Sequence, residues 1–316
     1  RYENFSQRVA KAKFEARVAP HQIDVYAEQK DDESLCYFKE ELAAWSERNL
    51  TVDFKAVARK LYPIVQSLPQ VIHHIHDVVK HLTEGIRSVS SISLEPLFGL
   101  VCVLARDLRV EIMPHFETIF LAIISTMDTA DPELLGSIFK TLSIVFKYLS
   151  KELLADMKRV KILYFGLLTN KKEHVQSFAA ESWAFLLRKL KGKALRTQCR
   201  NILSSVRPVA ANTPTLAGVG LVFFELVKSV QYQLHSNTAD VMKAVVSSIR
   251  PSSESSSSSS TLLPRGEEVV AVRFEIVQAA LTKICEHTKR EHFGVIWDVL
   301  LAEVTKAKSA WKKKPD

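Results

Sequence analysis

Apolar residues recur at three- and four-residue steps through the stretch from Asp131 to Gly192. This spacing puts them on one face of an α-helix and predicts two long amphipathic helices, one beginning near Asp131 and one running from about Lys172 to Leu190. A third helical segment, from Lys151 to Asn170, lies between them, and the connections are short, polar and without a strand pattern. Three successive helices of this kind satisfy their apolar faces most simply by stacking.

The apolar faces of the two long helices give a prediction for the core. In the helix from Asp131, Phe146 lies on the apolar face, whereas Ser143 falls away from it. In the helix from Lys172, Phe178 and Phe185 share one face, and further apolar residues beside them make the stripe too wide for a single neighbour. We therefore expect this helix to pack between others, with Phe146, Phe178 and Phe185 buried.

The same helical pattern returns along the chain at a spacing of roughly 40 residues, which falls in the range of HEAT and armadillo repeats. Several helices begin with capping signals, as in Asp131-Pro132-Glu133, and Thr51 and Asp53 are candidate caps for an earlier helix. The sequence therefore predicts an all-α fold, an α-solenoid of HEAT/armadillo-like helix pairs. The predicted pairs begin near Asp53, Ser93, Asp131, Lys172 and Pro214, and a last pair begins near Glu267 after an intervening serine tract.

Composition along the chain suggests five parts. A basic N-terminal arm and linker (1–34) precedes the helical-repeat solenoid (35–250), and a Ser-rich flexible linker (251–266) separates it from a further helix pair (267–304) and a basic tail (305–316). Phe5 and Val9 are candidate anchors for the arm, with Phe14 and Val18 beyond them. The serine tract lacks the apolar residues needed to order it, so a solvated insertion is favoured over a phosphorylation target.

Length and composition bound the class of protein. A chain of 316 residues with 47% hydrophobic content can bury a large interior but exceeds the size at which one compact core usually stops growing. The four cysteines are far apart with no CxxC pair, which favours buried, reduced thiols. No apolar run reaches the roughly 20 residues that span a bilayer, so we expect a soluble protein. Because the chain begins with Arg1, we expect it to be a piece of a longer one.

Motifs for catalysis or metal binding are weak. His74, Asp77 and His81, with His73 and His76 nearby, are the best metal candidates, but their spacing is not that of HExxH and a solvated helix face is favoured. Gly218-Val219-Gly220 follows no strand and lacks a third glycine, so it favours a close helix contact over a dinucleotide loop. No nucleophile elbow, phosphate loop or kinase set is present. The sequence therefore predicts no enzyme, no metal site and no cofactor.

A block of positive charge is the stronger signal. No acidic residue lies between Glu181 and Glu225, and in the short helix after Gly192 the apolar residues fall on one face and the cations on the other. Such a ridge can neutralise RNA phosphates with little sequence choice. It can equally be a solvated face or a dock for an acidic protein segment, and the sequence leaves these alternatives open. The candidate contact residues are Arg188, Lys189, Lys191, Lys193, Arg196, Arg200 and Arg207.

Five strings in the first two thirds of the chain resemble a known family. They are FKEELAAWSERNLT (38–51), LYPIVQSLPQVIHHI (61–75), VLARDLRVEIMPHFE (103–117), IFKTLSIVFKYLSKELLADM (138–157) and FAAESWAFLLRKLK (178–191). They are similar to the N-terminal region of the down-regulated-in-metastasis family, also called the U-three protein twenty family. The resemblance covers roughly Phe5 to Lys193, and its last two strings are the most specific.

That resemblance carries expectations about function. Members of the family are very large nucleolar HEAT-repeat proteins of the small-subunit processome, also called the 90S pre-ribosome, which processes precursor ribosomal RNA toward 18S ribosomal RNA. It therefore implies a ribosome-biogenesis scaffold in the nucleus and nucleolus. The implied partners are other processome proteins and the U-three small nucleolar RNA and pre-ribosomal RNA particle, with neither a membrane nor a small-molecule substrate. The alternative from a different class is a HEAT-repeat transport or cargo-adaptor protein.

Overall fold

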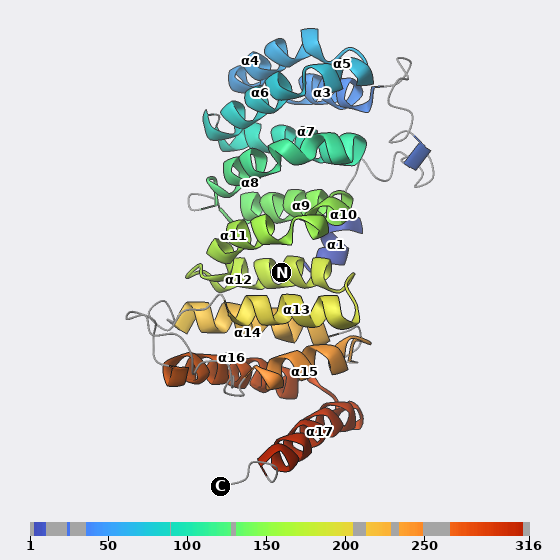
Figure 1. Ribbon diagram of the computed structural model, residues 1–316. Helices are drawn as coiled ribbons and strands as arrows, with labels where there is room; N and C mark the ends of the chain where they lie inside the picture. The colour runs from blue at the N-terminus through green and yellow to red at the C-terminus, as the bar shows by residue number, and fades with distance from the viewer. Residues whose placement is uncertain are drawn as a thin grey trace. The chain divides into compact units, whose positions relative to one another are not determined.

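The regular elements of the chain are helical. A computed structural model describes residues 3–10, 24–25, 36–88, 90–127, 131–204, 213–228, 234–248 and 266–311. Within these ranges the only β-type pairing is an isolated bridge between Lys228 and Leu234. The chain divides into two compact units, Arg1–Met157 and Lys158–Asp316. Helices stack in pairs through each unit (Figure 1), so the predicted all-α solenoid fold is confirmed.

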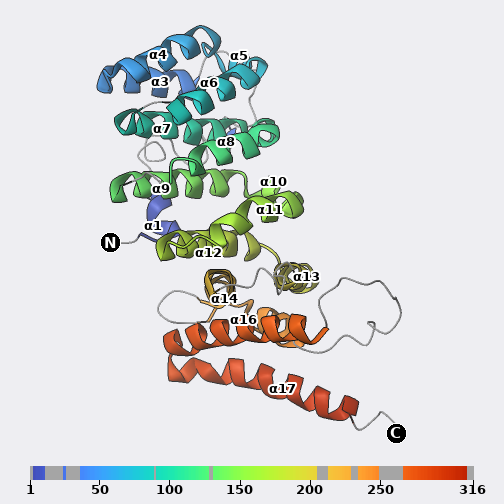
Figure 2. The ribbon, with the colours of Figure 1, turned by 90° about the vertical axis from the view of Figure 1, so that its left-hand side faces the viewer.

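Helices of the first unit form two rows. In one row α3 contacts α7 and α7 contacts α9, and in the other α4 contacts α6 and α6 contacts α8 (Figure 2). Each row buries the apolar faces that the pattern of the sequence predicts. The elements are α1 (Phe5–Ala10), α3 (Tyr37–Arg48), α4 (Val52–Leu61), η1 (Tyr62–Ile64), α5 (Leu68–His73), α6 (Ile75–Ser88), α7 (Ser91–Leu108), η2 (Arg109–His115), α8 (Phe116–Ile124), α9 (Pro132–Tyr148) and α10 (Ser150–Ala155).

The second unit repeats this plan. One row runs α12, α14, α16 and the other α13, α15, α17, each helix in contact with the next one of its row. The elements are α11 (Met157–Leu168), α12 (Glu173–Leu187), α13 (Gly192–Leu203), α14 (Thr213–Val227), α15 (Thr238–Ser247), α16 (Gly266–His287), η5 (Arg290–His292) and α17 (Phe293–Trp311). The starts of α12, α14 and α16 agree with those predicted near Lys172, Pro214 and Glu267.

Helix starts follow from local capping chemistry. The Asp131 carboxylate accepts a hydrogen bond from the backbone N–H of Leu134 at 2.8 Å, with Pro132 in the first turn of α9. The Thr51 hydroxyl accepts one from the backbone N–H of Phe54 at 3.4 Å at the start of α4. Thr51 is thus the cap of this helix. Asp53 lies within α4 and instead accepts a hydrogen bond from the N–H of Ser90 at 3.2 Å.

The core agrees with the sequence at most positions and differs at two. Phe146 and Phe178 are fully buried, as predicted. The prediction for Phe185 is wrong, because its ring is only half-buried and lies under the Lys189 ammonium, 5.0 Å from the ring centroid. The placement of Ser143 away from the buried face is also wrong. Helix α1 covers that side of α9, and Ser143 accepts a hydrogen bond from Nε of the buried Arg8 at 2.9 Å.

The predicted division into five parts stays a prediction. The stretches that would separate the arm and the serine linker from the solenoid include residues 11–23, 26–35 and 249–265, which lie outside the described ranges. So do Phe14 and Val18, whereas Phe5 is buried in α1 and Val9 packs partly buried beside Cys102 and Ile144. Helix α17 continues to Trp311, past residue 304 where the sequence places the start of the basic tail.

Gly218 gives the first testable consequence of the packing. A Cβ at Gly218 would overlap the backbone carbonyl oxygen of Leu168, so α14 approaches the end of α11 closely enough to require glycine. We expect Gly218→Ala to lower the free energy of unfolding by at least about 1–3 kcal/mol, the usual range for overpacking. Urea denaturation of the purified chain measures this.

Gly166 provides the matched control. It is exposed in α11, and a Cβ there would have no atom within 4 Å. Gly166→Ala is expected to stabilise the chain by up to about 1 kcal/mol, because alanine restricts the unfolded chain and favours helix. Equal effects of the two substitutions would contradict the close approach at Gly218.

The close approach of Gly218 to Leu168 confirms that Gly218-Val219-Gly220 marks a close helix contact, as the sequence predicts.

Candidate nucleic-acid interface

Helix α13 separates apolar and basic side chains as predicted. Leu195, Cys199 and Ile202 are all at most 2% exposed, whereas Lys193 and Arg200 are exposed to solvent. Helix α13 packs on α15 through its apolar side, which leaves the cations on the outside. The amphipathic prediction is therefore confirmed for the described part of this helix. Arg207 and Val206 lie outside the described residues.

Arg188 has a structural role. Its guanidinium donates hydrogen bonds to the backbone carbonyl oxygens of Glu225 and of Lys228, the latter at 2.5 Å. Asn237 in turn donates to the carbonyl oxygens of Arg188 and Leu190 at 3.3 and 3.4 Å. Burial lowers the pKa of Arg188, and the Glu225 carboxylate opposes that shift. These bonds tie the connection between α12 and α13 to the connection between α14 and α15, so the Arg188 side chain is committed to the fold.

Arg196 is paired inside the chain. Its Nη1 lies 2.5 Å from Oδ1 of Asp240 on α15, and both side chains are about one third exposed. The sequence interval around α13 contains no acidic residue, but stacking of the helices brings Asp240 of α15 beside α13. Sequence order alone could not reveal this pairing.

Four of the seven candidate cations remain open to solvent: Lys189, Lys191, Lys193 and Arg200. Lys189, Lys191 and Lys193 lie at the connection between α12 and α13, and Arg200 follows about two turns along α13. None of these four forms an ion pair with another described residue. The structure thus brings together a smaller basic cluster than the sequence predicts.

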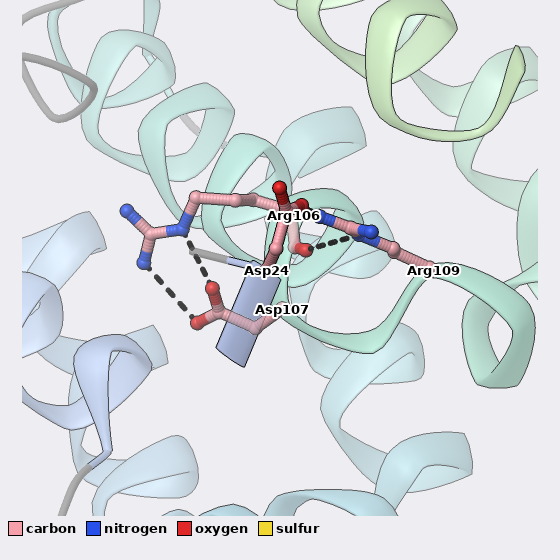
Figure 3. A network of polar contacts seen from close by, with 4 residues as sticks. All are labelled: Asp24, Arg106, Asp107 and Arg109. Atoms are coloured by element: carbon pink, nitrogen blue, oxygen red, sulfur yellow. Dashed lines mark hydrogen bonds and ion pairs between the residues drawn. The ribbon is translucent and has the colours of Figure 1, made fainter. Parts of the chain in front are cut away.

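A buried charge network at the end of α7 was missed by the sequence analysis. Nε and Nη2 of Arg106 donate to the two carboxylate oxygens of Asp107 at 2.6 and 3.2 Å (Figure 3), and both side chains are at most 3% exposed. The guanidinium also lies 4.9 Å from the centroid of the Tyr37 ring on α3. Burial raises the pKa of the Asp107 carboxyl, while Arg106 opposes that rise.

This network reaches the N-terminal part of the chain. Arg109, directly after α7, donates from Nη2 to Oδ1 of Asp24 at 2.8 Å (Figure 3). Adjacent helical residues do not normally face each other, so the Arg106-Asp107 dipeptide gives no pairing signal by spacing. The available signal is that two charges directly follow the apolar run from Leu97 to Ala105, where burial requires a partner.

The histidines do not form the face that their spacing suggests. The helix is interrupted at His74, which caps the end of α5, and α6 begins at Ile75, so His74 and His81 lie on different helices. The His76 and His115 rings lie 5.8 Å apart, and burial together with His76 lowers the pKa of His115. Among the described residues no group of three His, Cys, Asp or Glu side chains could hold a metal ion.

Cysteine burial agrees with the prediction at three positions. Cys36, Cys102 and Cys199 are buried free thiols, and burial raises the pKa of Cys199 to about 12. Cys285 is exposed, so the expectation of burial is wrong there. In the described part of the chain no helix has the length and apolarity needed to cross a bilayer.

An open groove crosses the first row of the second unit. It measures about 540 Å³ and runs over α12, α14 and α16. Gln176, Glu173 and Glu275 supply polar groups, as do Gln278, Thr282 and Lys283. Gly220 and Ala279 also line the groove, and a Cβ at Gly220 would lie 3.1 Å from that of Ala279.

Comparison with known proteins supports the resemblance in the strings. No protein-family model matches the chain. A stretch of 251 residues, 78% of the chain, is 28% identical to a protein of Saccharomyces cerevisiae. This chain is similar to U3 small nucleolar RNA-associated protein 20. The protein of the same name from Schizosaccharomyces pombe is 26% identical over 234 residues, 73% of the chain.

The similarity to U3 small nucleolar RNA-associated protein 20 confirms the resemblance predicted from the five strings. The chain spans only 10% and 9% of the length of these two relatives. Their name describes an association with a small nucleolar RNA and no catalytic activity.

Proposed function

We propose that this chain is part of a structural scaffold of the small-subunit processome, acting in pre-ribosomal RNA processing and 18S ribosomal RNA maturation. The similarity to two proteins named for association with U3 small nucleolar RNA carries this proposal. The scaffold would work in the nucleolus, with other processome proteins and the U3 particle as partners. It would act by binding and would carry out no reaction itself.

Stacked helix pairs suit this role. Each repeat contacts only its neighbours and leaves its outer faces exposed, so a row of helices offers a long, ordered binding surface. In the second unit the groove over α12, α14 and α16 would accept a protein segment. The exposed cations Lys189, Lys191, Lys193 and Arg200 would face RNA or an acidic partner. Separate surfaces for separate partners are what a scaffold requires.

Recovery of RNA from cells tests the proposal. The affinity-tagged 316-residue chain is expressed in cells and purified from nuclear extract. We expect it to enrich U3 small nucleolar RNA at least roughly tenfold over the control. The control is a tagged, unrelated helical-repeat protein of similar charge, because a cationic surface alone attracts RNA without specificity. Imaging should place it in the nucleolus. Recovery of U3 RNA no better than the control would reject the scaffold role. Movement between nucleus and cytoplasm with a bound protein cargo would instead favour the transport adaptor.

A further inference from the structure

Connections between paired helices gather at one edge of the second unit. In Figure 1 the end of α12 and the start of α13 lie on the right, as do the end of α14 with the start of α15 and the end of α16 with the start of α17. The hydrogen bonds from Asn237 to the carbonyl oxygens of Arg188 and Leu190 connect the first two joins directly. At the third join the same two rows continue, since α16 packs on α14 and α17 packs on α15. Side chains far apart in sequence therefore line one edge.

Exposed cations occupy this edge at both ends. Lys189, Lys191 and Lys193 stand at the first join, and Lys289 and Arg290 stand at the third; these five residues are called the basic edge below. None of the five forms an ion pair with a described residue. Because helices in contact lie about 8–10 Å apart, the basic edge extends for about 20 Å along the stack.

Acidic side chains near this edge are mostly engaged. Glu225 accepts from Lys228 at 2.9 Å at the middle join, and Asp240 is paired with Arg196. Glu291 is exposed and lies 3.6 Å from Nε2 of His292. The side chains of the basic edge therefore keep a net positive charge.

Two aromatic rings are exposed at the start of α17. Phe293 is 37% exposed and Trp297, one turn further, is 56% exposed. They lie three and seven residues after Arg290 in the chain. Cations that track a backbone together with exposed rings are the combination on which single-stranded nucleic acids bind, since every base can stack on a ring.

We propose that the basic edge, with Phe293 and Trp297, binds the phosphate backbone of single-stranded RNA without sequence preference. A chain of regularly repeated charges fits cations spread along several joins. An acidic protein segment is the alternative occupant that the test below separates. The inference deepens the proposed function by naming the partner of one surface. The proposed RNA contact is therefore the basic edge, to which three helix pairs contribute, and not the cationic face of α13 alone.

Binding of a labelled single-stranded RNA of mixed sequence, about 16 nucleotides long, to the 316-residue chain tests this. The edge variant Lys289→Glu with Arg290→Glu should weaken binding roughly tenfold and lower the slope of log affinity against log salt by about 0.7 per lost contact. Both side chains are exposed, so helix content by circular dichroism should not change. Lys191→Glu with Lys193→Glu, at the other end, should act in the same direction.

The matched control is Lys171→Glu with Lys243→Glu. Both lysines are exposed, Lys171 lies at the opposite end of α12, and the change in net charge is the same. Binding should weaken by no more than about twofold, since all five cations of the basic edge are kept in this variant. Equal losses in the two double variants would overturn the proposal. So would normal RNA binding by the edge variant combined with lost binding to poly-glutamate, which would assign the edge to an acidic polypeptide.

Trp297→Ala tests whether this surface prefers single-stranded RNA over duplex RNA. It should weaken binding of the single strand by roughly fivefold or more and leave binding of a duplex of the same sequence unchanged. Equal effects on both RNAs, or none on either, would overturn the single-strand assignment. These experiments and the test of the proposed function can fail independently. If the edge variants bind RNA normally while U3 RNA is recovered from cells, only the basic-edge proposal fails. If the chain binds RNA through the basic edge but recovers no U3 RNA from cells, only the proposed function fails.

Discussion

Replacing Asp107 by alanine is expected to lower the free energy of unfolding of the first unit by roughly 3–5 kcal/mol. The substitution removes the carboxylate that accepts two hydrogen bonds from the buried Arg106 guanidinium. A buried charge is costly when it loses a close, oppositely charged partner, because that attraction offsets part of the cost of leaving water. Urea denaturation followed by circular dichroism measures the change.

Two further variants show whether the effect comes from the lost charge pair. Arg106→Met combined with Asp107→Leu removes both charges while filling the space, and it should recover most of the lost stability. Asp24→Ala breaks the neighbouring ion pair to Arg109, in which the Asp24 side chain is 67% exposed. It should cost at most about 1 kcal/mol, as exposed pairs do. A double variant as unstable as Asp107→Ala alone would contradict this account.

Phe178→Ala is expected to cost roughly 3–5 kcal/mol, because it empties a fully buried site in α12. Its neighbours on this helix, among them Trp183 and Leu186, are at most 2% exposed and belong to a packed interior that cannot collapse fully onto the space. The loss should appear as a lower urea midpoint for the second unit.

Phe185 is the control within the same helix. Its ring is half-buried and contacts the Lys189 ammonium, so removing it opens no closed cavity. Phe185→Ala should cost less than Phe178→Ala, since the ring of Phe185 is partly exposed and less of its area is removed from water. Equal losses would mean that Phe185 is covered in solution.

The sequence predicted those features that depend on local order. The apolar period located the helices, and Asp131 and Thr51 capped them because capping uses backbone groups only a few residues away. The family resemblance was found because its strings are contiguous. The orientation of α13 followed from its own residues.

What could not be predicted depends on partners far along the chain. Arg196 and Asp240 are 44 residues apart, and Arg188 reaches carbonyl oxygens 37 and 40 residues away. A basic run therefore contained two residues committed to the fold, which spacing could not separate from the exposed ones. Ser143 was misplaced for the same reason, because the helix that covers it comes from the other end of the unit.

The hydrogen bond from Arg8 to Ser143 spans 135 residues of sequence and has a consequence for how the first unit is made. Helices α3 to α8 find neighbours soon after they are synthesised, but α1 has its docking site only once α9 exists. At synthesis rates of about 5–20 residues per second, that wait is on the order of ten seconds. Packing of α1 onto α9 is therefore a late step in the folding of the first unit on the ribosome. Until α9 has been made, chaperones can bind the face of α1 that is later buried.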